Sequence, residues 1–303
     1  MAVTLKQTMN SIAKKSNAIN ELKDEERIEL QKCLLDMYVD ILNVSKKYNI
    51  KPFLQGGSAL GAVRHGGYIP WDDDFDLGMS RDDYNLFIKI FNSELCEKYI
   101  LKAPNSNFKC NERFMKVLKK DTIYKTIESN TESEDNLIFI DIFPIDYAPN
   151  SRALQFVKGT YCNAIMFIAG QVKFRKNSNE NIKQFFSISF LTKANYYIRN
   201  FIGFLFSFAS TDSWYKLSDK VIRAKKHTKY CTSATGRKHY LGEIVLDNVF
   251  FPLKMMKFEG IQSYIPNNID AYLKNLYGEY MKIPPVEKRE KHFIIELKTK
   301  IDK

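Results

Sequence analysis

Residues 55–79 read QGGSALGAVRHGGYIPWDDDFDLGM, and this stretch decides how the rest of the chain is interpreted. Glycines stand beside a basic Arg64–His65 pair, and four aspartates follow within five positions. Glycine is used where the backbone turns tightly or approaches a ligand closely. Clustered carboxylates repel one another unless a cation or a proton relieves the repulsion. The stretch therefore predicts a functional site and not a part of the core.

The glycines at the start of this stretch predict a helix N-terminus beside a bound group. Ser58 is a good N-cap residue for a short helix over residues 59–64. A helix that begins just after a glycine turn directs backbone N–H groups at its neighbour, an arrangement that suits a phosphate. Gly56, Gly57 and Ser58 are therefore predicted to bind phosphate groups of a substrate.

The aspartates are expected to begin a strand that runs over residues 74–79. Side chains on a strand repeat every two residues, so alternate aspartates point to the same face. This alternation leaves Asp73 on the opposite face and places three carboxylates together, those of Asp72, Asp74 and Asp76. Phe75 and Leu77 would then point into the core. Three carboxylates on one edge could share a divalent cation.

A second strand supplies a further carboxylate. Residues 136–144 (NLIFIDIFP) form a nearly continuous apolar run, which is typical of a central strand buried on both faces. Asp141 stands in the middle of this run, where an unpaired buried carboxylate would be unfavourable. Asp141 is therefore predicted to meet a metal ion or a basic partner. Asp146 follows five residues later and is expected in a helix or a turn.

Together these residues predict phosphoryl chemistry. Carboxylates on neighbouring strands commonly hold one or two Mg²⁺ (or Mn²⁺) ions beside a phosphate ester. Such a cation neutralises charge on phosphate oxygens, and a free carboxylate can take the proton of an attacking hydroxyl. Arg64 or His65 could pair with a phosphate oxygen. The candidate metal ligands are Asp72, Asp74, Asp76 and Asp141, of which the last three are also the candidate catalytic residues.

Composition narrows the class of protein. A chain of 303 residues with 45% hydrophobic and 27% charged residues can bury a sizeable core and is not wholly disordered. Its net charge of +11 is compatible with nucleic acid, an anionic membrane surface or a small polyanionic substrate. No nucleic-acid-binding motif is recognisable, so nucleic acid is not expected as a partner.

The cysteines and the first residues favour the cytoplasm. Five cysteines, an odd number without C-x-x-C spacing, indicate no disulfide framework and suit a reducing compartment. Residues 1–18 hold no continuous apolar stretch, so no signal peptide is apparent. Peripheral contact with the inner face of the membrane is left open by an apolar patch over residues 201–209.

Helical spacing of apolar residues predicts two helical parts of the chain. One is a long amphipathic helix over residues 24–49, and the other is the aromatic-rich stretch over residues 151–235. Residues 201–209 (FIGFLFSFA) are apolar, but they are far fewer than the roughly 20 residues that span a bilayer. This patch is either a helix lying on a membrane surface or an ordinary buried helix.

Several separated blocks of the sequence resemble the LicD-type family. They are GGSALGAVRHGGYIPWDDDFDLGM, FIDIFPID, and later FEG, YLKNLYGEYMKIPP and REKH, and the resemblance covers roughly residues 48–292. This family comprises bacterial phosphocholine transferases and animal fukutin-related relatives. The resemblance implies an α+β fold, with a nucleotidyltransferase-like mixed sheet flanked by helices and a mostly helical insertion. Residues 1–150 would hold an N-terminal helix and the catalytic core, residues 151–235 the insertion, and residues 236–303 the remainder of the catalytic unit.

The resemblance also implies a reaction. A phospho-alcohol, phosphocholine by default, would pass from a CDP-linked donor such as CDP-choline to a hydroxyl of a cell-surface glycan or its lipid-linked precursor. CMP would be released, and the transfer would depend on a metal ion.

The family's motifs match particular positions of this chain. Its Gly-Ser turn, Asp-x-Asp pair and third carboxylate match Gly57–Ser58, Asp74–Asp76 and Asp141, and its tryptophan-acid segment matches Trp71–Asp72. Arg289 and His292 are similar to a further family pattern and are candidate substrate-binding residues. The chain departs from many relatives in having Gly-Gly-Ser in place of Gly-Thr and Phe75 in place of a smaller aliphatic residue. Neither departure removes a charge.

Two other functions compete with this one. A nucleotidyltransferase would place a nucleotide on its acceptor and release pyrophosphate instead of CMP. A non-catalytic basic module would bind lipid or nucleic acid with a steep dependence on salt and without need of the aspartates.

Overall fold

The computed structural model describes residues 22–106, 110–126, 136–178, 182–183, 186–187, 189–224, 226–289 and 294–301. The helices are α2 (Asp24–Lys47), α3 (Gly56–His65), α4 (Arg81–Glu94), α5 (Arg152–Asn177), α7 (Phe190–Leu205), α8 (Thr211–Ile222), α9 (His239–Gly242), α10 (Asp247–Phe250) and α11 (Ile269–Tyr277), with the 3₁₀ turn η1 (Val286–Lys288). The strands are β1 (Phe53–Leu54), β2 (Asp76–Ser80), β3 (Tyr99–Lys102), β4 (Met115–Lys119), β5 (Ile123–Thr126), β6 (Phe139–Ala148), β7 (Tyr230–Thr232), β8 (Val245–Leu246), β9 (Lys254–Phe258), β10 (Ile261–Ile265) and β11 (Ile294–Lys298).

Most of the strands join one mixed sheet, in the order β3-β4-β6-β2-β1-β10-β9. β6 lies between β4, to which it is antiparallel, and β2, to which it is parallel. The far end of β6 pairs with β7, which in turn pairs with β8. β5 and β11 form a separate pair. Helices flank the mixed sheet, which confirms the predicted α+β fold class, and β6 is the central strand that its apolar run predicts.

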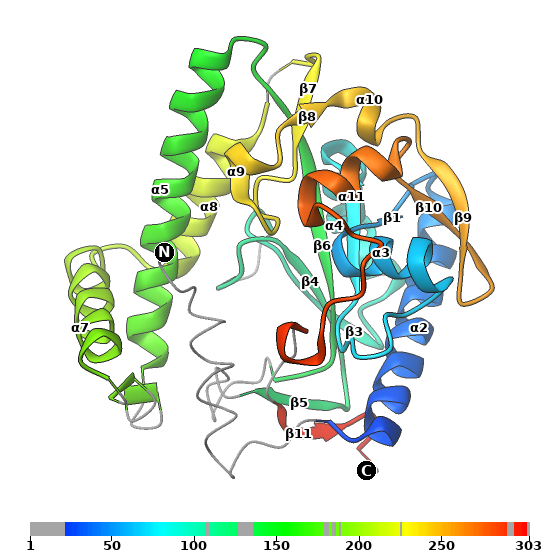
Figure 1. Cartoon of the computed structure of the whole chain (residues 1–303), viewed down its shortest axis with the longest axis horizontal. Coiled ribbons are helices and arrows are strands. Elements are labelled where there is room, and N and C mark those ends of the chain that lie inside the picture. The colour runs from blue at the N-terminus through cyan, green and yellow to red at the C-terminus, as the bar shows by residue number, and fades with distance from the viewer. Residues whose placement is uncertain are drawn as a thin grey trace.

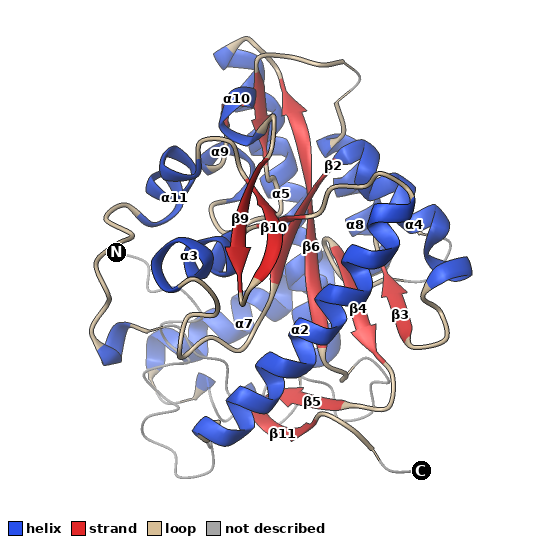
Figure 2. Ribbon diagram, turned by 90° about the vertical axis from the view of Figure 1, so that its right-hand side faces the viewer, coloured by secondary structure: helices blue, strands red, loops and turns tan. Residues whose placement is uncertain are grey.

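The helices lie on opposite sides of the sheet. In Figure 1, α5, α7 and α8 form the left-hand side of the molecule and α2 the right-hand side, with the strands between them. Figure 2 shows α2 crossing the sheet in front of β6, with α5 and α7 behind it.

The division into three parts at residues 150 and 235 stays a prediction.

The first helix and the acidic stretch share one aromatic core. α2 buries an apolar stripe that includes Leu34, Tyr38 and Ile41, as its helical spacing predicts. The ring of Tyr38 lies 4.8 Å from that of Phe75, and the Phe75 ring lies 5.4 Å from that of Phe258 at the end of β9. Because burying such a side chain contributes about 1.5–3 kcal/mol, this cluster holds the acidic stretch firmly between α2 and the sheet.

The predicted position of the aspartates on the strand is wrong. β2 begins only at Asp76, so Asp72 and Asp74 precede the strand and the two-residue alternation does not apply to them. The N–H of Asp72 donates to the carbonyl oxygen of Ile69 at 2.9 Å and closes a turn after Pro70. The predicted burial of Phe75 and Leu77 is confirmed, since they are 1% and 0% exposed.

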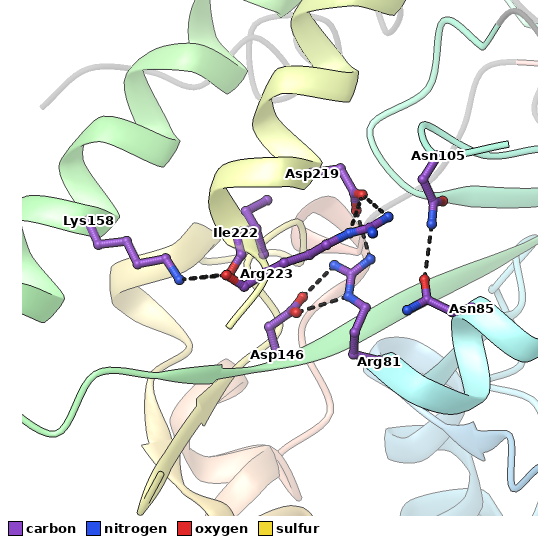
Figure 3. Close-up of polar contacts among 8 residues, drawn as sticks. All are labelled: Arg81, Asn85, Asn105, Asp146, Lys158, Asp219, Ile222 and Arg223. Atoms are coloured by element: carbon purple, nitrogen blue, oxygen red, sulfur yellow. Dashed lines mark hydrogen bonds and ion pairs between the residues drawn. The ribbon is translucent and has the colours of Figure 1, made fainter. Parts of the chain in front are cut away.

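A buried ion-pair network joins the sheet to the helical part of the chain (Figure 3). The guanidinium of Arg81, at the start of α4, donates from Nε and Nη2 to the two carboxylate oxygens of Asp146, at 2.9 and 2.5 Å. Its Nη1 donates to Asp219 on α8 at 2.8 Å, and Asp219 also accepts from Arg223. Asp146 therefore lies on β6 and not in a helix or turn as predicted, and its buried charge is compensated by Arg81.

Among the described residues of the stretch 151–235 that was predicted to be helical, α5, α7 and α8 are helices. Ser189 and Ser210 cap the N-termini of α7 and α8 by accepting hydrogen bonds from Thr192 and Ser213. α8 ends at Ile222, and β7 follows within the same stretch. The side chains of Phe201, Phe204 and Phe208 are more than half exposed, and that of Leu205 is half exposed. Of the two alternatives for residues 201–209, the buried helix is therefore wrong.

No helix in the described parts of the chain combines the length and the apolar content that crossing a membrane requires.

Candidate active site

Three consecutive aspartates form a cluster of carboxylates in the turn before β2. Asp72, Asp73 and Asp74 each offer an oxygen, and these oxygens all lie within 4.8 Å of one another. Asp73, which strand alternation places on the opposite face, is part of the cluster and is 8% exposed. The turn is held from α2, where Gln31 donates from Nε2 to the carbonyl oxygen of Asp72 at 2.9 Å. The first helix therefore positions the carboxylates.

The two remaining predicted ligands lie side by side in the sheet. Asp76 on β2 and Asp141 on β6 are directly paired in the parallel register of these strands. Their side chains come from adjacent strands at the same level, next to the turn that carries the other carboxylates. The predicted partnership between the acidic stretch and the second strand is thus present in the fold. Binding of a metal ion by these side chains stays a prediction.

Asp141 has a basic partner, as the sequence predicts. Lys116 faces it from β4 in the antiparallel register, and Lys116 Nζ lies 3.2 Å from Asp141 Oδ1. The same ammonium lies 3.5 Å from the ring centroid of Phe139, a cation–π contact. Lys116 was not among the predicted site residues. Its signal is a single lysine inside the apolar run of residues 114–118 (FMKVL).

The pKa values of Asp72 and Asp141 are raised. Burial and then the charges of Asp74, Asp73 and Asp76 hold the pKa of Asp72 well above its usual range. Burial raises the pKa of Asp141 to about 6, against the opposing charge of Lys116 and with a smaller contribution from Asp74. A bound divalent cation would offset the free-energy cost of burying such carboxylates and would reduce the repulsion between them. The donor set, all oxygen and all acidic, therefore fits Mg²⁺ or Mn²⁺.

Two glycines allow the N-terminus of α3 to approach these carboxylates. Gly56 has a positive φ of +54°, and a Cβ atom there would lie 2.4 Å from Asp76 Oδ2. A Cβ atom on Gly57 would lie 2.8 Å from Asp72 Oδ2 and 3.9 Å from Asp74 Oδ1. Such close approach is possible only without a side chain.

Gly57→Ala is expected to displace the Asp72 carboxylate and lower the transfer rate by about 100-fold, because misplacing a catalytic group by about 1 Å can cost that much. Steady-state rates at saturating substrate and metal measure the effect. Gly170→Ala is the matched control, since no atom lies within 4 Å of a Cβ built at Gly170 on α5. Equal rates for both variants would contradict the close approach of α3 to Asp72.

The start of α3 differs from the prediction. The helix begins at Gly56 with Gln55 as its N-cap, so Ser58 lies in the first turn and is not the cap. Ser58 Oγ instead accepts from the Asp76 N–H at 2.9 Å and ties α3 to β2. The N–H of Gly57 donates to Asp76 Oδ2 at 3.3 Å, and that of Gly56 donates to the hydroxyl of Tyr272 at 3.0 Å. Phosphate binding by Gly56, Gly57 and Ser58 stays a prediction.

The predicted basic residues gather around Trp71, next to the carboxylates. The guanidinium of Arg289 lies 4.0 Å from the Trp71 ring centroid, and that of Arg64 lies 5.7 Å from it. Arg64 also donates to the carbonyl oxygen of Tyr280 and to His65. Burial and the charge of Arg64 lower the pKa of His65, so its imidazole is neutral at pH 7. His292 lies outside the described residues.

A loop and a tyrosine that sequence reasoning did not assign to the site complete its surroundings. The loop over residues 233–238 packs against the start of α3, where Gln55 donates from Nε2 to Ser233 Oγ at 2.7 Å. Arg237 in this loop lies 5.2 Å from the ring centroid of Tyr277. Burial and then the charge of Asp76 raise the pKa of Tyr277, while Arg237 opposes the rise. Arg237 thus brings positive charge beside the carboxylates.

Glu243 holds this loop and carries a strongly shifted pKa. Its Oε1 accepts from the Lys238 N–H at 2.9 Å, and the side chain is buried. Burial raises its pKa from 4.5 to about 7, against the Lys238 hydrogen bond and the charges of Arg113, Lys238 and Arg237. Between pH 4.5 and about 7, the Glu243 carboxyl is therefore protonated to a greater extent in the folded chain than in the unfolded chain.

Stability is expected to fall as the pH rises from 4.5 to about 7 because Glu243 ionises at a cost only in the folded chain. Glu243→Gln should match the wild type at pH 4 and exceed its free energy of unfolding at pH 8 by at most about 3 kcal/mol. Unfolding midpoints measured from pH 4 to 8 test this, with Glu97→Gln, an exposed carboxylate, as the control. Parallel pH profiles for the Glu243→Gln variant and the wild type would refute the burial of an ionisable Glu243.

Comparisons with known proteins find a family model and several relatives that resemble this chain. Residues 49–176 match the family model described as LicD/FKTN/FKRP, nucleotidyltransferase domain. The chain is 26% identical over 253 residues to the lipopolysaccharide cholinephosphotransferase LicD of Haemophilus influenzae, covering 83% of this chain and 89% of that protein. It is 46% identical over 43 residues to human ribitol 5-phosphate transferase FKRP, covering 14% of this chain and 9% of FKRP. It is 34% identical over 84 residues to an uncharacterized protein of Rickettsia typhi, covering 28% of this chain and 27% of that protein.

The matched range begins just before β1 and ends near the end of α5, so it contains α3, β2 and β6 with all the candidate carboxylates. The similarity to the LicD/FKTN/FKRP nucleotidyltransferase domain thus covers the part of this chain that carries the candidate site.

Proposed function

We propose that this chain transfers a phospho-alcohol from a CDP-linked donor to a hydroxyl of a glycan or glycan precursor and releases CMP. The observation that carries the proposal is the set of carboxylates in the turn before β2 and on the adjacent strands β2 and β6. The chain is a phosphotransferase by its relatives, one of which is a lipopolysaccharide cholinephosphotransferase and another a ribitol 5-phosphate transferase. Phosphocholine is the default group, because the relative with the longer match carries it in its name.

Different carboxylates of the site would have different roles in this reaction. Asp72, Asp74, Asp76 and Asp141 would hold one or two Mg²⁺ or Mn²⁺ ions, which when bound would neutralise charge on the donor's phosphate oxygens. A carboxylate of the cluster that is not engaged by the cation takes the proton of the attacking hydroxyl. Among the carboxylates, Asp73 is the one that the predicted ligand set omits, and its place in the cluster makes it a candidate for either role.

Basic residues on the rim of the site bind the donor. Lys116 on β4 and Arg237 in the loop over residues 233–238 offer positive charge to phosphate oxygens. Arg289 and Arg64 stack near Trp71 and present further positive charge.

A panel of CDP-linked alcohols tests the proposed donor. Each is incubated with Mg²⁺ and a glycan acceptor, and CMP and pyrophosphate are measured together. CMP from one CDP-alcohol, with no pyrophosphate, is the expected result. Pyrophosphate formed from CTP together with a nucleotide on the acceptor would establish the competing nucleotidyltransferase. Salt-sensitive binding of lipid or nucleic acid by the Asp74→Asn variant, with no turnover by the wild type, would establish a binding module.

The predicted cytoplasmic location is a separate matter, for which fractionation of cells is the test.

A further inference from the structure

One face of α7 is apolar and exposed along its whole length. The exposed large apolar side chains recur at intervals of three, four or seven residues, as on one side of a helix. They are Phe190, Leu191, Tyr197, Ile198, Phe201, Phe204 and Leu205, and Phe208 follows just beyond the helix. Phe190 is 85% exposed and Phe208 is 78% exposed. The opposite face packs on α5, where a Cβ on Gly203 would lie 2.5 Å from the carbonyl oxygen of Gln171.

The neighbouring helix α5 carries further exposed large apolar side chains. They are Leu154, Phe156, Val157, Tyr161 and Phe167, all more than half exposed. Figure 1 shows α5 and α7 together on the left-hand edge of the molecule, away from β9 and α2 on the right. Monomeric proteins seldom leave so many large apolar side chains exposed on adjacent elements without a partner.

The charge of this part of the chain is strongly positive. Between Asp146 and Asp212 the sequence holds eight lysines and arginines and one carboxylate, Glu180. This segment therefore accounts for +7 of the chain's net charge of +11. Neither α5 nor α7 contains an aspartate or glutamate. A surface of this kind is complementary to an anionic partner and repels a basic one.

A pocket lies beside the apolar face. It encloses about 580 Å³ between the end of α5, α7 and the start of α8. Its polar lining includes Arg175, Lys176, Ser178, Tyr196 and Asn200. The guanidinium of Arg175 also lies 5.2 Å from the ring centroid of Phe204, so the pocket and the apolar face adjoin. Two cationic groups with hydroxyl and amide donors form a suitable environment for a phosphate.

We propose that the exposed face of α7 docks on an anionic membrane and that the pocket takes the phosphate of a lipid headgroup. Amphipathic helices with aromatic and leucine side chains on one side and lysine or arginine nearby lie in the membrane interface in this way. The cores of protein–protein interfaces are instead depleted in lysine. The proposal goes beyond the transfer reaction, since no residue of α7 or of the pocket is assigned to the carboxylate site.

Binding to vesicles tests the proposal without any assay of transfer. The full chain is mixed with vesicles of phosphatidylglycerol and phosphatidylcholine, or of phosphatidylcholine alone, and the bound fraction is measured by flotation. Strong binding is expected only to the vesicles with phosphatidylglycerol, and added salt should weaken it. Equal binding to both kinds of vesicle would contradict the charge component.

Two pairs of variants separate the apolar and the cationic contributions. Phe201→Ser/Phe208→Ser is expected to lower the affinity by about tenfold or more. Its matched control is Met255→Ser/Ile295→Ser, which removes exposed apolar side chains from β9 and β11. Arg175→Gln/Lys176→Gln should also lower the affinity for anionic vesicles, whereas Lys254→Gln/Lys257→Gln on β9, with the same change of charge, should not. Unfolding midpoints equal to the wild type show that each variant is folded.

Two results would overturn the proposal. One is wild-type affinity for anionic vesicles in both the apolar and the cationic variants. The other is a concentration-dependent dimer in the absence of vesicles that Phe201→Ser/Phe208→Ser abolishes, since the face would then bind a second copy of this chain.

Discussion

Replacing Asp74 or Asp141 with asparagine is expected to lower the rate of CMP release by about 1,000-fold, which corresponds to about 4 kcal/mol of transition-state stabilisation. Asparagine keeps the size of the side chain and removes its charge. The loss is expected because both carboxylates belong to the proposed metal site. They are close enough that the charge of Asp74 contributes to the raised pKa of Asp141. The rate is measured with the donor and acceptor that the panel of CDP-linked alcohols identifies.

Metal binding gives this prediction a second readout. Mg²⁺ or Mn²⁺ should raise the unfolding temperature of the wild type, because a ligand that binds only the folded state stabilises it. The Asp74→Asn and Asp141→Asn variants should show a much smaller rise. Asp82→Asn is the matched control, since Asp82 is an exposed aspartate in the first turn of α4, outside the cluster. Full activity in both cluster variants would remove the basis for the metal site.

Arg81→Met is expected to lower the free energy of unfolding by about 3–5 kcal/mol, because removing one partner of a buried ion pair leaves an uncompensated charge. The side chains of Asp146 and Asp219 are only 1% and 6% exposed, and both depend on Arg81. Figure 3 shows that the network joins β6, α4 and α8, so the loss should loosen the helical part from the sheet. Denaturant unfolding followed by circular dichroism measures the change.

Arg223→Met is the matched control for this prediction. Its side chain is 37% exposed, and Asp219 keeps its bond to Arg81 when Arg223 is removed. The expected loss is below about 1 kcal/mol, as for a partly exposed ion pair. Similar losses in the two variants would show that Arg81 is not the central cation of the network.

The parts of the fold that the sequence predicted well depend on local periodicity. α2 runs over Asp24–Lys47 because its apolar residues recur at helical spacing, and β6 is central because its apolar run is continuous. Both patterns report burial on one or both faces, and each can be read without knowing the neighbouring element. Asp141 was predicted to need a cation for the same reason, and Lys116 supplies one.

The details of the site were less predictable because contacts distant in sequence decide them. The turn that removes Asp72 and Asp74 from β2 is held by Gln31, about forty residues earlier on α2. The Asp146 carboxylate can be buried on β6 because Arg81, 65 positions away, neutralises its charge. No local pattern contains these partners. Residue types and spacing predicted which side chains gather, but not the backbone that presents them.

For α7, too, the local sequence pattern did not predict which elements surround the helix. The apolar pattern of residues 201–209 was compatible with a buried helix or with a surface helix, since periodicity indicates which residues share a face and not what covers it. Packing decides between them: α7 uses Gly203 to approach α5 and leaves its phenylalanines outward.

The most direct test of the proposed reaction is its stoichiometry in a single mixture. The wild-type chain is incubated with the CDP-linked donor, a glycan acceptor and Mg²⁺, and mass spectrometry follows both products. The account predicts one CMP for each acceptor that gains the phospho-alcohol, and neither product after chelation of the metal. Release of pyrophosphate with a nucleotide on the acceptor, or undiminished transfer after chelation, would contradict it.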